Sequence, residues 1–234
     1  MSPRSSSDSR DPKGQFVTSI VEETPPLPRI VQAGDPVLRQ AADVVEPREI
    51  ETPAFRALLE TMVSVMRAAP GVGLAATQIG VPKRVIVLED REELLARLDA
   101  EGRAARERVP LPLTIIVNPT LRRFEERTAT FLEGCLSVSG YVALVRRALE
   151  VEVTGLDATE SVAVPRVWRL RGWPARILQH EIDHLNGTLY VDRMYPRSLS
   201  GPEESHRWAG KTTQDIAAAL GIDLSEEAPG EVRS

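Results

Sequence analysis

The hydrophobic positions between Phe55 and Met66 repeat with the spacing of an α-helix. They fall at i, i+3, i+4, i+7, i+8 and i+11, and they comprise Phe55, Leu58, Leu59, Met62, Val63 and Met66. A helix with about 3.6 residues per turn brings such positions to one face. Pro70-Gly71 then favours the end of the helix. The pattern predicts a helix whose apolar face, methionines included, packs in the core.

A second helix is predicted between residues 172 and 187. Pro174 lies in its first turn, and Asn186-Gly187 is typical of a helix C-terminus. One face carries an apolar stripe that can hold the helix in a core. That stripe consists of Leu178, Ile182 and Leu185.

Short segments that are rich in β-branched residues, or that alternate in polarity, predict strands. They comprise residues 84–88, 114–117, 128–132, 150–154, 162–170 and 188–192. We expect the second strand to end at Asn118-Pro119. The fifth should lie at a sheet edge, because Pro165 has no N–H to donate. Strands precede, separate and follow the two main helices without regular alternation. The fold class is therefore α+β, with antiparallel or mixed β-sheets packed around the second helix.

The chain length suits one folded domain with tails. Residues 1–25 are rich in Ser, Arg, Asp and Pro and predict a disordered N-terminal arm. The folded domain spans residues 26–200, and residues 201–234 form a C-terminal extension with a helical piece near 215–220. Residues 90–108 are highly charged and predict a surface helical insertion, with leucines at helical spacing. Those leucines are Leu94, Leu95 and Leu98.

Charge and cysteine content narrow the classes of function. The net charge of −5 gives no reason to expect a nucleic-acid-binding surface. No apolar run approaches a membrane span, and no segment reads as a secretory signal. A single cysteine excludes an internal disulfide and fits a reducing cytosol, so we expect a bacterial-type cytoplasmic protein. An organellar location is the alternative, but Asp8 and Asp11 are unusual in a transit peptide.

The second predicted helix contains the pattern H-E-x-x-H at residues 180–184. His180 and His184 are four residues apart, about 40° around the helix axis, so both can bind one metal ion. Glu181 lies beside them and can reach a metal-bound water. An ordinary amphipathic helix with hydrogen-bonded core histidines would show the same pattern. The rest of the chain therefore decides between the two interpretations.

The third metal ligand is the next question, because catalytic zinc-type sites use three protein ligands and leave one position for water. A metzincin site is disfavoured because its third histidine position is Tyr190 here. Glu203 and Glu204 would suit a thermolysin-like site, but they lie in a polar segment. Cys135 is the better candidate because it is the single cysteine and lies in a Gly-flanked turn. Its thiolate favours Fe(II), Zn or Co over hard cations.

Small residues dominate the segment from Gly71 to Gly80, so its backbone can closely approach another group. The G-x-G within it does not predict a dinucleotide loop, because a helix and not a strand precedes it. Gln78 is an amide donor in an otherwise apolar setting. A loop with one solvated glutamine is the alternative interpretation.

Three segments resemble the three motifs of the peptide deformylase family, in that family's order. They are G-V-G-L-A-A-T-Q (71–78), E-G-C-L-S (133–137) and Q-H-E-I-D-H-L-N-G (179–187). The resemblance runs from about Leu27 to Arg197, so residues 26–200 would form the catalytic domain. Two further segments, G-D-P-V-L (34–38) and G-W-P-A-R-I-L (172–178), resemble the plant and organellar branch of the family.

The resemblance implies a metallohydrolase that removes the formyl group from the N-terminal formyl-methionine of newly made polypeptides. It implies one Fe(II) ion per chain, with Zn, Ni or Co able to substitute. Cys135, His180 and His184 would be the ligands. Formyl-Met peptides and nascent chains would be the partners, with the ribosome as a further candidate.

Each remaining residue of the motifs then acquires an expected role. The bound metal would supply hydroxide near neutral pH, and Glu181 would act as general base and then as general acid. The Gln78 amide and the Leu136 backbone N–H would donate to the developing oxyanion. Glu133 would orient a metal ligand. Substrate would be bound by Val72, Gly73, Gly134 and Ile177.

One position departs from the family pattern. Many deformylases carry an arginine seven residues after the ligand cysteine, and here that position is Val142, with Arg146 and Arg147 nearby. We expect this departure to affect the affinity for the substrate or the preferred length of the peptide. The alternatives to a standard deformylase are a secondary copy with altered substrate, an H-E-x-x-H zinc peptidase, and a non-catalytic descendant that binds formylated peptides or ribosomes.

Overall fold

The computed structural model describes residues 8–10, 16–18, 26–69, 71–96, 98–123 and 127–225. Its α-helices are α1 (Pro47–Ile50), α2 (Pro53–Ala68), α3 (Glu92–Leu95), α4 (Ala100–Ala105), α5 (Gly172–Leu185), α6 (Pro202–Ser205) and α7 (Thr213–Leu220). Its strands are β1 (Asp8–Arg10), β2 (Phe16–Thr18), β3 (Gly73–Ala75), β4 (Val85–Asp90), β5 (Leu111–Arg123), β6 (Thr128–Cys135), β7 (Val138–Ala148), β8 (Glu150–Asp157) and β9 (Val164–Arg171).

The core is built around one antiparallel sheet with the strand order β3-β4-β5-β8-β9. Strand β4 is buried along its whole length, and its side chains alternate between two faces. Val85 and Val87 belong to the cluster formed with α2, whereas Ile86 and Leu88 belong to the cluster formed with α5. The sheet is therefore covered on both faces by the two helices that the sequence predicts, and the α+β class is confirmed.

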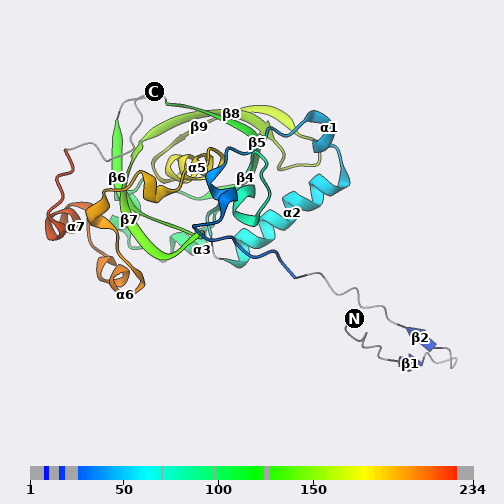
Figure 1. Ribbon diagram of the computed structural model, residues 1–234, viewed down its shortest axis with the longest axis horizontal. Helices are drawn as coiled ribbons and strands as arrows, with labels where there is room; N and C mark the ends of the chain where they lie inside the picture. The colour runs from blue at the N-terminus through cyan, green and yellow to red at the C-terminus, as the bar shows by residue number, and fades with distance from the viewer. Residues whose placement is uncertain are drawn as a thin grey trace.

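Helix α5 lies near the centre of the molecule, beneath the arch of β5, β8 and β9, while α2 lies at the periphery (Figure 1). Nearly every residue of α5 is buried. The predicted stripe of Leu178, Ile182 and Leu185 packs on the sheet. The predicted position of this helix is thus confirmed.

A separate hairpin, β6 and β7, lies against the other side of α5. The chain after α5 returns along this hairpin, and isolated bridges join Val145 to Met194 and Val142 to Ser200. Helix α7 closes a small apolar cluster there with Leu144 and Tyr195. The predicted helical piece near residues 215–220 is confirmed by α7.

Two strand predictions are wrong in part. Strand β5 does not end at Asn118-Pro119 but continues to Arg123 through a shift of register after Val117. Asn118 adopts a φ of 52°, and its side-chain amide exchanges two hydrogen bonds with the Val45 backbone, which holds the irregularity in place. Residues 190–192 form a 3-10 helix and not a strand, because Asp192 accepts a hydrogen bond from the Leu189 N–H.

Within the predicted folded domain, two strands have no predicted counterpart. Strand β7 was not predicted, because Ser139-Gly140 and Arg146-Arg147 interrupt its apolar alternation. The small-residue segment interpreted as a loop begins as β3 and continues as a 3-10 helix over Ala76–Ile79. The backbone of this segment is therefore fixed by pairing with β4.

The charged insertion contains two short helices, α3 and α4. The leucine spacing predicts the first of them. Leu94 and Leu95 are buried, which anchors the insertion to the core. Strands β1 and β2 fall within the predicted N-terminal arm. The other residues of 1–25 lie outside the described residues, so their predicted disorder stays a prediction.

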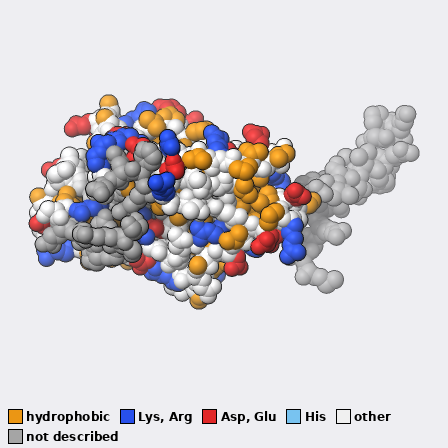
Figure 2. Space-filling view, turned by 90° about the horizontal axis from the view of Figure 1, so that it is seen from above, with side chains coloured by type: hydrophobic (Ala, Val, Ile, Leu, Met, Phe, Trp, Pro, Cys, Tyr) orange, Lys and Arg blue, Asp and Glu red, His pale blue; other side chains and the backbone are white. Residues whose placement is uncertain are grey.

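The surface carries charged side chains of both signs intermixed, as the face in Figure 2 shows. Strand β9 shows how such charges pair, with the ion pairs Arg166–Asp157 and Arg169–Glu152 to β8. Among the described residues, no helix is both long and apolar enough to cross a membrane.

Candidate metal centre and active site

Helix α5 brings polar side chains into the interior on the face opposite its apolar stripe. Glu181 and His184 are 5% and 1% exposed, and His180 lies one turn before His184. The apolar stripe fixes the rotation of the helix, and His180 and His184 are turned toward Cys135 at the end of β6. Burial of the stripe therefore orients the polar residues.

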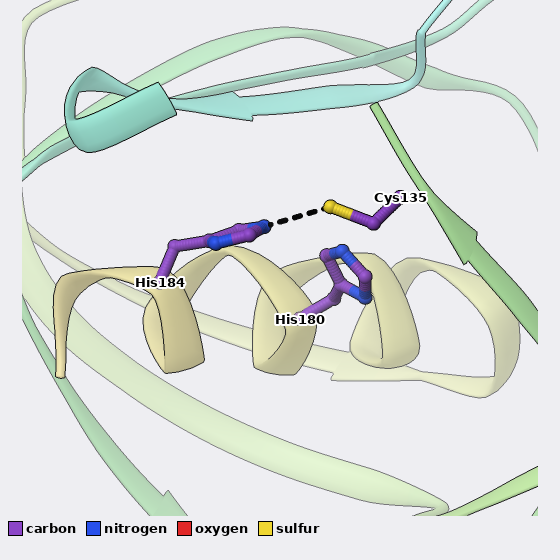
Figure 3. A group of neighbouring side chains, drawn as sticks. All are labelled: Cys135, His180 and His184. Carbon is purple, nitrogen blue, oxygen red and sulfur yellow. Dashed lines mark hydrogen bonds between the residues drawn. The ribbon is translucent and has the colours of Figure 1, made fainter. Parts of the chain in front are cut away.

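Cys135 meets the two histidines at the end of β6. The register between β6 and β7 shifts between Gly134 and Cys135, which ends regular pairing there. The Cys135 Sγ lies 3.3 Å from His184 Nε2, and the ligand atoms of Cys135, His180 and His184 all lie within 4.8 Å of one another. Figure 3 shows both imidazoles on one side of α5, turned toward the thiol. One thiolate and two imidazoles fit a metal ion with one position left for water.

Glu133 fixes the orientation of His180. Its Oε2 lies 2.9 Å from His180 Nδ1. Burial raises the pKa of Glu133, but attraction to Arg147 and Arg176 outweighs it and holds that pKa well below its usual range. The ionised carboxylate can only accept, so Nδ1 donates its proton and Nε2 keeps a lone pair for a metal. From this position the Glu133 carboxylate can orient the imidazole of His180, which is the role expected of it.

A buried ion network extends from Glu133 to the far side of α5. Arg147 donates to both Glu133 oxygens and to Asp183 Oδ2. Arg176 also donates to Glu133, and Arg193 donates to Asp183. Arg147, Glu133 and Asp183 have side chains exposed by less than a tenth, so the charges neutralise one another in a site largely withdrawn from water.

Arg147→Met is expected to lower the free energy of unfolding by about 3–5 kcal/mol, because it leaves the Glu133 and Asp183 carboxylates short of a buried partner. Urea denaturation followed by circular dichroism would measure this. Arg166→Met is the matched control, since its side chain is 58% exposed and its ion pair with Asp157 should contribute at most about 1 kcal/mol. Equal small losses in both variants would contradict the structural role of the network.

Glu181 packs directly against the backbone of Gly73. A Cβ at residue 73 would lie 2.3 Å from Glu181 Oε1, so any larger residue there requires the Glu181 side chain to move. Burial raises the pKa of Glu181 to about 7. Among the described residues, Glu181 Oε2 and His184 Nδ1 are buried polar atoms without a hydrogen-bond partner. Buried polar atoms ordinarily have partners, so the Glu181 oxygen fits a site that holds a water or another polar group beside it.

Gln78 is held by both ends of its amide. Its Oε1 accepts from the Ala75 N–H at 2.9 Å, and its Nε2 donates to Ser137 Oγ at 3.2 Å and lies 3.6 Å from Cys135 Sγ. The side chain is 2% exposed, so the solvated-glutamine alternative is wrong. Its Nε2–H group is therefore held beside the cysteine.

One cavity of about 430 Å³ gathers nearly all the predicted site residues. It is lined by Val72, Gly73, Gln78, Glu133, Gly134, Cys135, Leu136, Ile177, His180 and Glu181. His184 is the exception and lies beneath the cavity wall as a 1% exposed side chain. Residues that are over 100 positions apart in the chain thus meet at one opening.

No sequence pattern singles out Arg176, Asp183 and Arg193 as site residues. The directions of Arg146 and Arg147 also do not follow from the sequence. The structure separates these last two, because Arg147 enters the buried network whereas Arg146 donates to the Leu224 carbonyl and lies over the Tyr195 ring. A signal was present: Arg147 shares a strand face with Ala143 and Val145, and a charge on an apolar face indicates a buried ion pair.

Comparison with known proteins gives a consistent result. A sequence profile of the family described as Polypeptide deformylase matches residues 27–199. The chloroplastic peptide deformylase 1A of Solanum lycopersicum is 50% identical over 174 residues, which cover 74% of this chain and 61% of the tomato protein. Peptide deformylase 1 of Streptomyces coelicolor is 44% identical over 216 residues, covering 92% of this chain and 95% of the relative.

Solved structures agree with these sequence matches. A peptide deformylase from Acinetobacter baumannii with bound Met-Ala-Ser superposes with a TM-score of 0.63 at 30% identity, covering 72% of this chain and 99% of the other. A peptide deformylase from Synechococcus elongatus in complex with actinonin gives 0.59 at 30% identity, covering 88% and 92%. The fold, the match over residues 27–199 and the plant relatives confirm the resemblance drawn from three motifs: the chain belongs to the polypeptide deformylase family.

Proposed function

We propose that this protein hydrolyses the formyl group from the N-terminal formyl-methionine of newly made polypeptides, with release of formate. The observation that carries the proposal is the convergence of Cys135, His180 and His184 beside the buried Glu181 carboxylate, in one cavity. Such a set joins three metal donors to a proton-transfer group within one site. Family membership supports the reaction and the use of a metal.

Cys135, His180 and His184 would hold one metal ion per chain. When bound, the ion supplies a hydroxide nucleophile near neutral pH and withdraws electron density from the formyl carbonyl. We propose Fe(II) as the physiological ion, with Zn, Ni or Co able to substitute, because a thiolate with two imidazoles suits these metals better than hard cations. The hypothesis of iron predicts activity that declines in air.

Glu181 transfers the protons in the proposed reaction. Its carboxylate accepts a proton from the attacking water and later gives one to the leaving amine. Contact with Gly73 holds the carboxylate beside the metal donors. The Gln78 Nε2–H and the Leu136 backbone N–H would donate to the formyl oxygen as its negative charge grows. Gln78 is suited to this because its Oε1 is already fixed by the Ala75 N–H.

The peptide part of the substrate would pair with the edge strand β3. Within the described part of the chain, β3 pairs with β4 alone, and Val72 and Gly73 line the cavity. An extended peptide can add to such an edge through main-chain hydrogen bonds. Gly134 and Ile177 line the same cavity and would contact the bound methionine. We propose nascent chains in a bacterial-type cytoplasm as the setting, with the ribosome as a further candidate partner.

The test of this function is formate release. Protein purified without oxygen and loaded with Fe(II) should release one formate for each free amine from formyl-Met-Ala-Ser. Acetyl-Met-Ala-Ser should not react, because the larger acyl group meets the walls of the site. No formate despite one bound metal per chain would overturn the proposal. Cleavage of the Met-Ala bond would favour the zinc peptidase instead.

Gly73→Ala is expected to lower kcat for formate release by up to about 10²-fold, because the new methyl group displaces the Glu181 carboxylate. Steady-state assays on the Fe(II) protein would show it. Gly201→Ala is the control, since a Cβ there would be 3.5 Å from the Tyr141 ring, an ordinary contact. Wild-type kcat in Gly73→Ala would show that the position of Glu181 is not critical.

A further inference from the structure

A glutamine outside the three motifs reaches the turn that follows the cysteine. Gln32 lies just before a 3-10 helix over Pro36–Arg39, and its Nε2 donates to the Leu136 carbonyl at 3.0 Å. We propose that Gln32 is a positioning residue for the Cys135 thiolate. It acts through the peptide group that joins Leu136 to Ser137. This inference rests on the proposed function, because it takes the cysteine as a metal ligand.

One peptide group connects the glutamine to the sulfur. The Leu136 carbonyl and the Ser137 N–H belong to the same planar trans unit, so they point in opposite directions. The carbonyl accepts from Gln32, and the N–H donates to Cys135 Sγ at 3.4 Å. Fixing the carbonyl therefore fixes the direction of the N–H toward the sulfur. Hydrogen bonds at both ends of one peptide group also polarise each other, which strengthens the bond to sulfur.

Gln32 is itself held at both ends of its amide. Its Oε1 accepts from the Ser139 hydroxyl at 2.9 Å and from the Ser139 N–H at 3.3 Å. Its Nε2 also donates to the Ile30 carbonyl at 3.3 Å, within its own segment. The amide therefore spans the turn from Leu136 to Ser139. Gln32 lies outside the cavity lining, so it acts on the turn and not on a bound substrate.

The backbone around Gln32 is bound to two of the three motifs. The Val31 N–H donates to the Gln78 carbonyl at 2.9 Å. The Ala33 N–H donates to the Ser137 carbonyl at 2.7 Å. The backbone is thus fixed on both sides of Gln32, so the side chain starts from a fixed point beside the cysteine turn although it is exposed.

The N–H donor matters because the thiolate is the form of cysteine that binds a metal. A hydrogen bond to the sulfur stabilises its negative charge and fixes its direction, and such bonds tune metal–sulfur centres. Loss of a direct hydrogen-bond partner of a ligand typically costs about 10–100-fold in metal affinity. Gln32 acts one hydrogen bond further from the sulfur, so we expect a smaller effect of about 3- to 10-fold.

The experiment measures how fast the whole chain, loaded with Co(II), releases the metal to excess EDTA. Gln32→Glu and Gln32→Leu remove the donation to the Leu136 carbonyl, and each should release cobalt about 3- to 10-fold faster than wild type. Gln32→Lys keeps an N–H donor on a long side chain and should stay within about twofold of wild type. Charge alone predicts the opposite order, because an added carboxylate attracts the cation and an added ammonium repels it.

A second readout separates positioning from general stability. The thiolate-to-cobalt charge-transfer absorption should move to longer wavelength in Gln32→Glu and Gln32→Leu, because a sulfur with a weakened N–H partner is richer in electrons. Ser139→Ala is the control, since the Ser139 N–H still donates to the same Gln32 oxygen. Its release rate and its absorption should match those of wild type.

Wild-type release rates and absorption in Gln32→Glu and Gln32→Leu would show that the inference is wrong, even if both variants unfold at a lower temperature. Slower release from Gln32→Glu than from Gln32→Lys would assign the effect to charge and overturn it as well. The deformylase function would still stand on formate release by wild type. If wild type shows the thiolate–cobalt absorption but releases no formate, the proposed function fails, and the order of release rates still decides the role of Gln32. If wild type binds no cobalt, both proposals fail.

Discussion

Glu181→Gln is expected to lower kcat for formate release by about 10²–10⁴-fold, the range typical of removing a general acid–base group. Glutamine has nearly the shape of glutamate, so its contact with Gly73 and the surrounding packing should persist. It cannot accept the proton of the attacking water, because the amide is not basic. The fall should therefore appear in kcat, with metal content and KM changed little.

Formate assays combined with metal analysis of the same samples would test this. Glu60→Gln is the matched control, because it makes the same change of charge on an exposed face of α2. It should leave both measurements at wild-type values. A Glu181→Gln protein that keeps kcat within about tenfold of wild type would assign proton transfer to another group. The non-catalytic alternative predicts no turnover in wild type either.

Cys135→Ser is expected to abolish formate release through loss of the metal. A neutral hydroxyl replaces the thiolate that lies between the two imidazoles, 3.3 Å from His184 Nε2. Removing only a hydrogen-bond partner of a metal ligand already costs about 10–100-fold in affinity, so removing a ligand should exceed the upper end of that range. Metal content after dialysis and formate release should fall together.

Ser139→Ala is the control for this substitution, because the exposed Ser139 hydroxyl donates to Gln32 Oε1 and not to the metal donors. Thermal unfolding should show that Cys135→Ser still folds when no metal is added. The variant also separates two chemistries. A zinc peptidase with Glu203 or Glu204 as third ligand would keep its metal and its activity without the thiol, and that result would exclude Cys135 as a ligand.

The elements that the sequence predicts well are those in which one periodicity runs without interruption. The apolar spacing from Phe55 to Met66 became α2, and the stripe on α5 became the contact with the sheet. Strand β7 was missed because two arginines interrupt its alternation, although one of them is buried in the ion network. Local pattern can indicate that a charged side chain is buried, but it does not identify partners that lie on other elements.

The strand predicted at residues 188–192 was wrong for a related reason. Tyr190 and Val191 suit a strand, but the side chain of Asp192 bonds back to the Leu189 N–H and closes a turn. Propensity is a weak guide where one local hydrogen bond offers the backbone an alternative. The end predicted for β5 at Asn118-Pro119 was wrong because the Asn118 side chain satisfies the Val45 backbone and allows the strand to continue.

The family, the helix that carries His180, Glu181 and His184, and the set of residues expected at the site all follow from the amino-acid sequence. They do so because a helical repeat and three short motifs are local properties of the chain. How Glu133 is held ionised against His180, and which arginines reach it, depend on packing between elements. The same packing brings Ser205, beyond the segment that the family profile matches, to the cavity. These features depend on contacts between segments far apart in the chain, and such contacts exist only once the sheet, α5 and the hairpin are packed together.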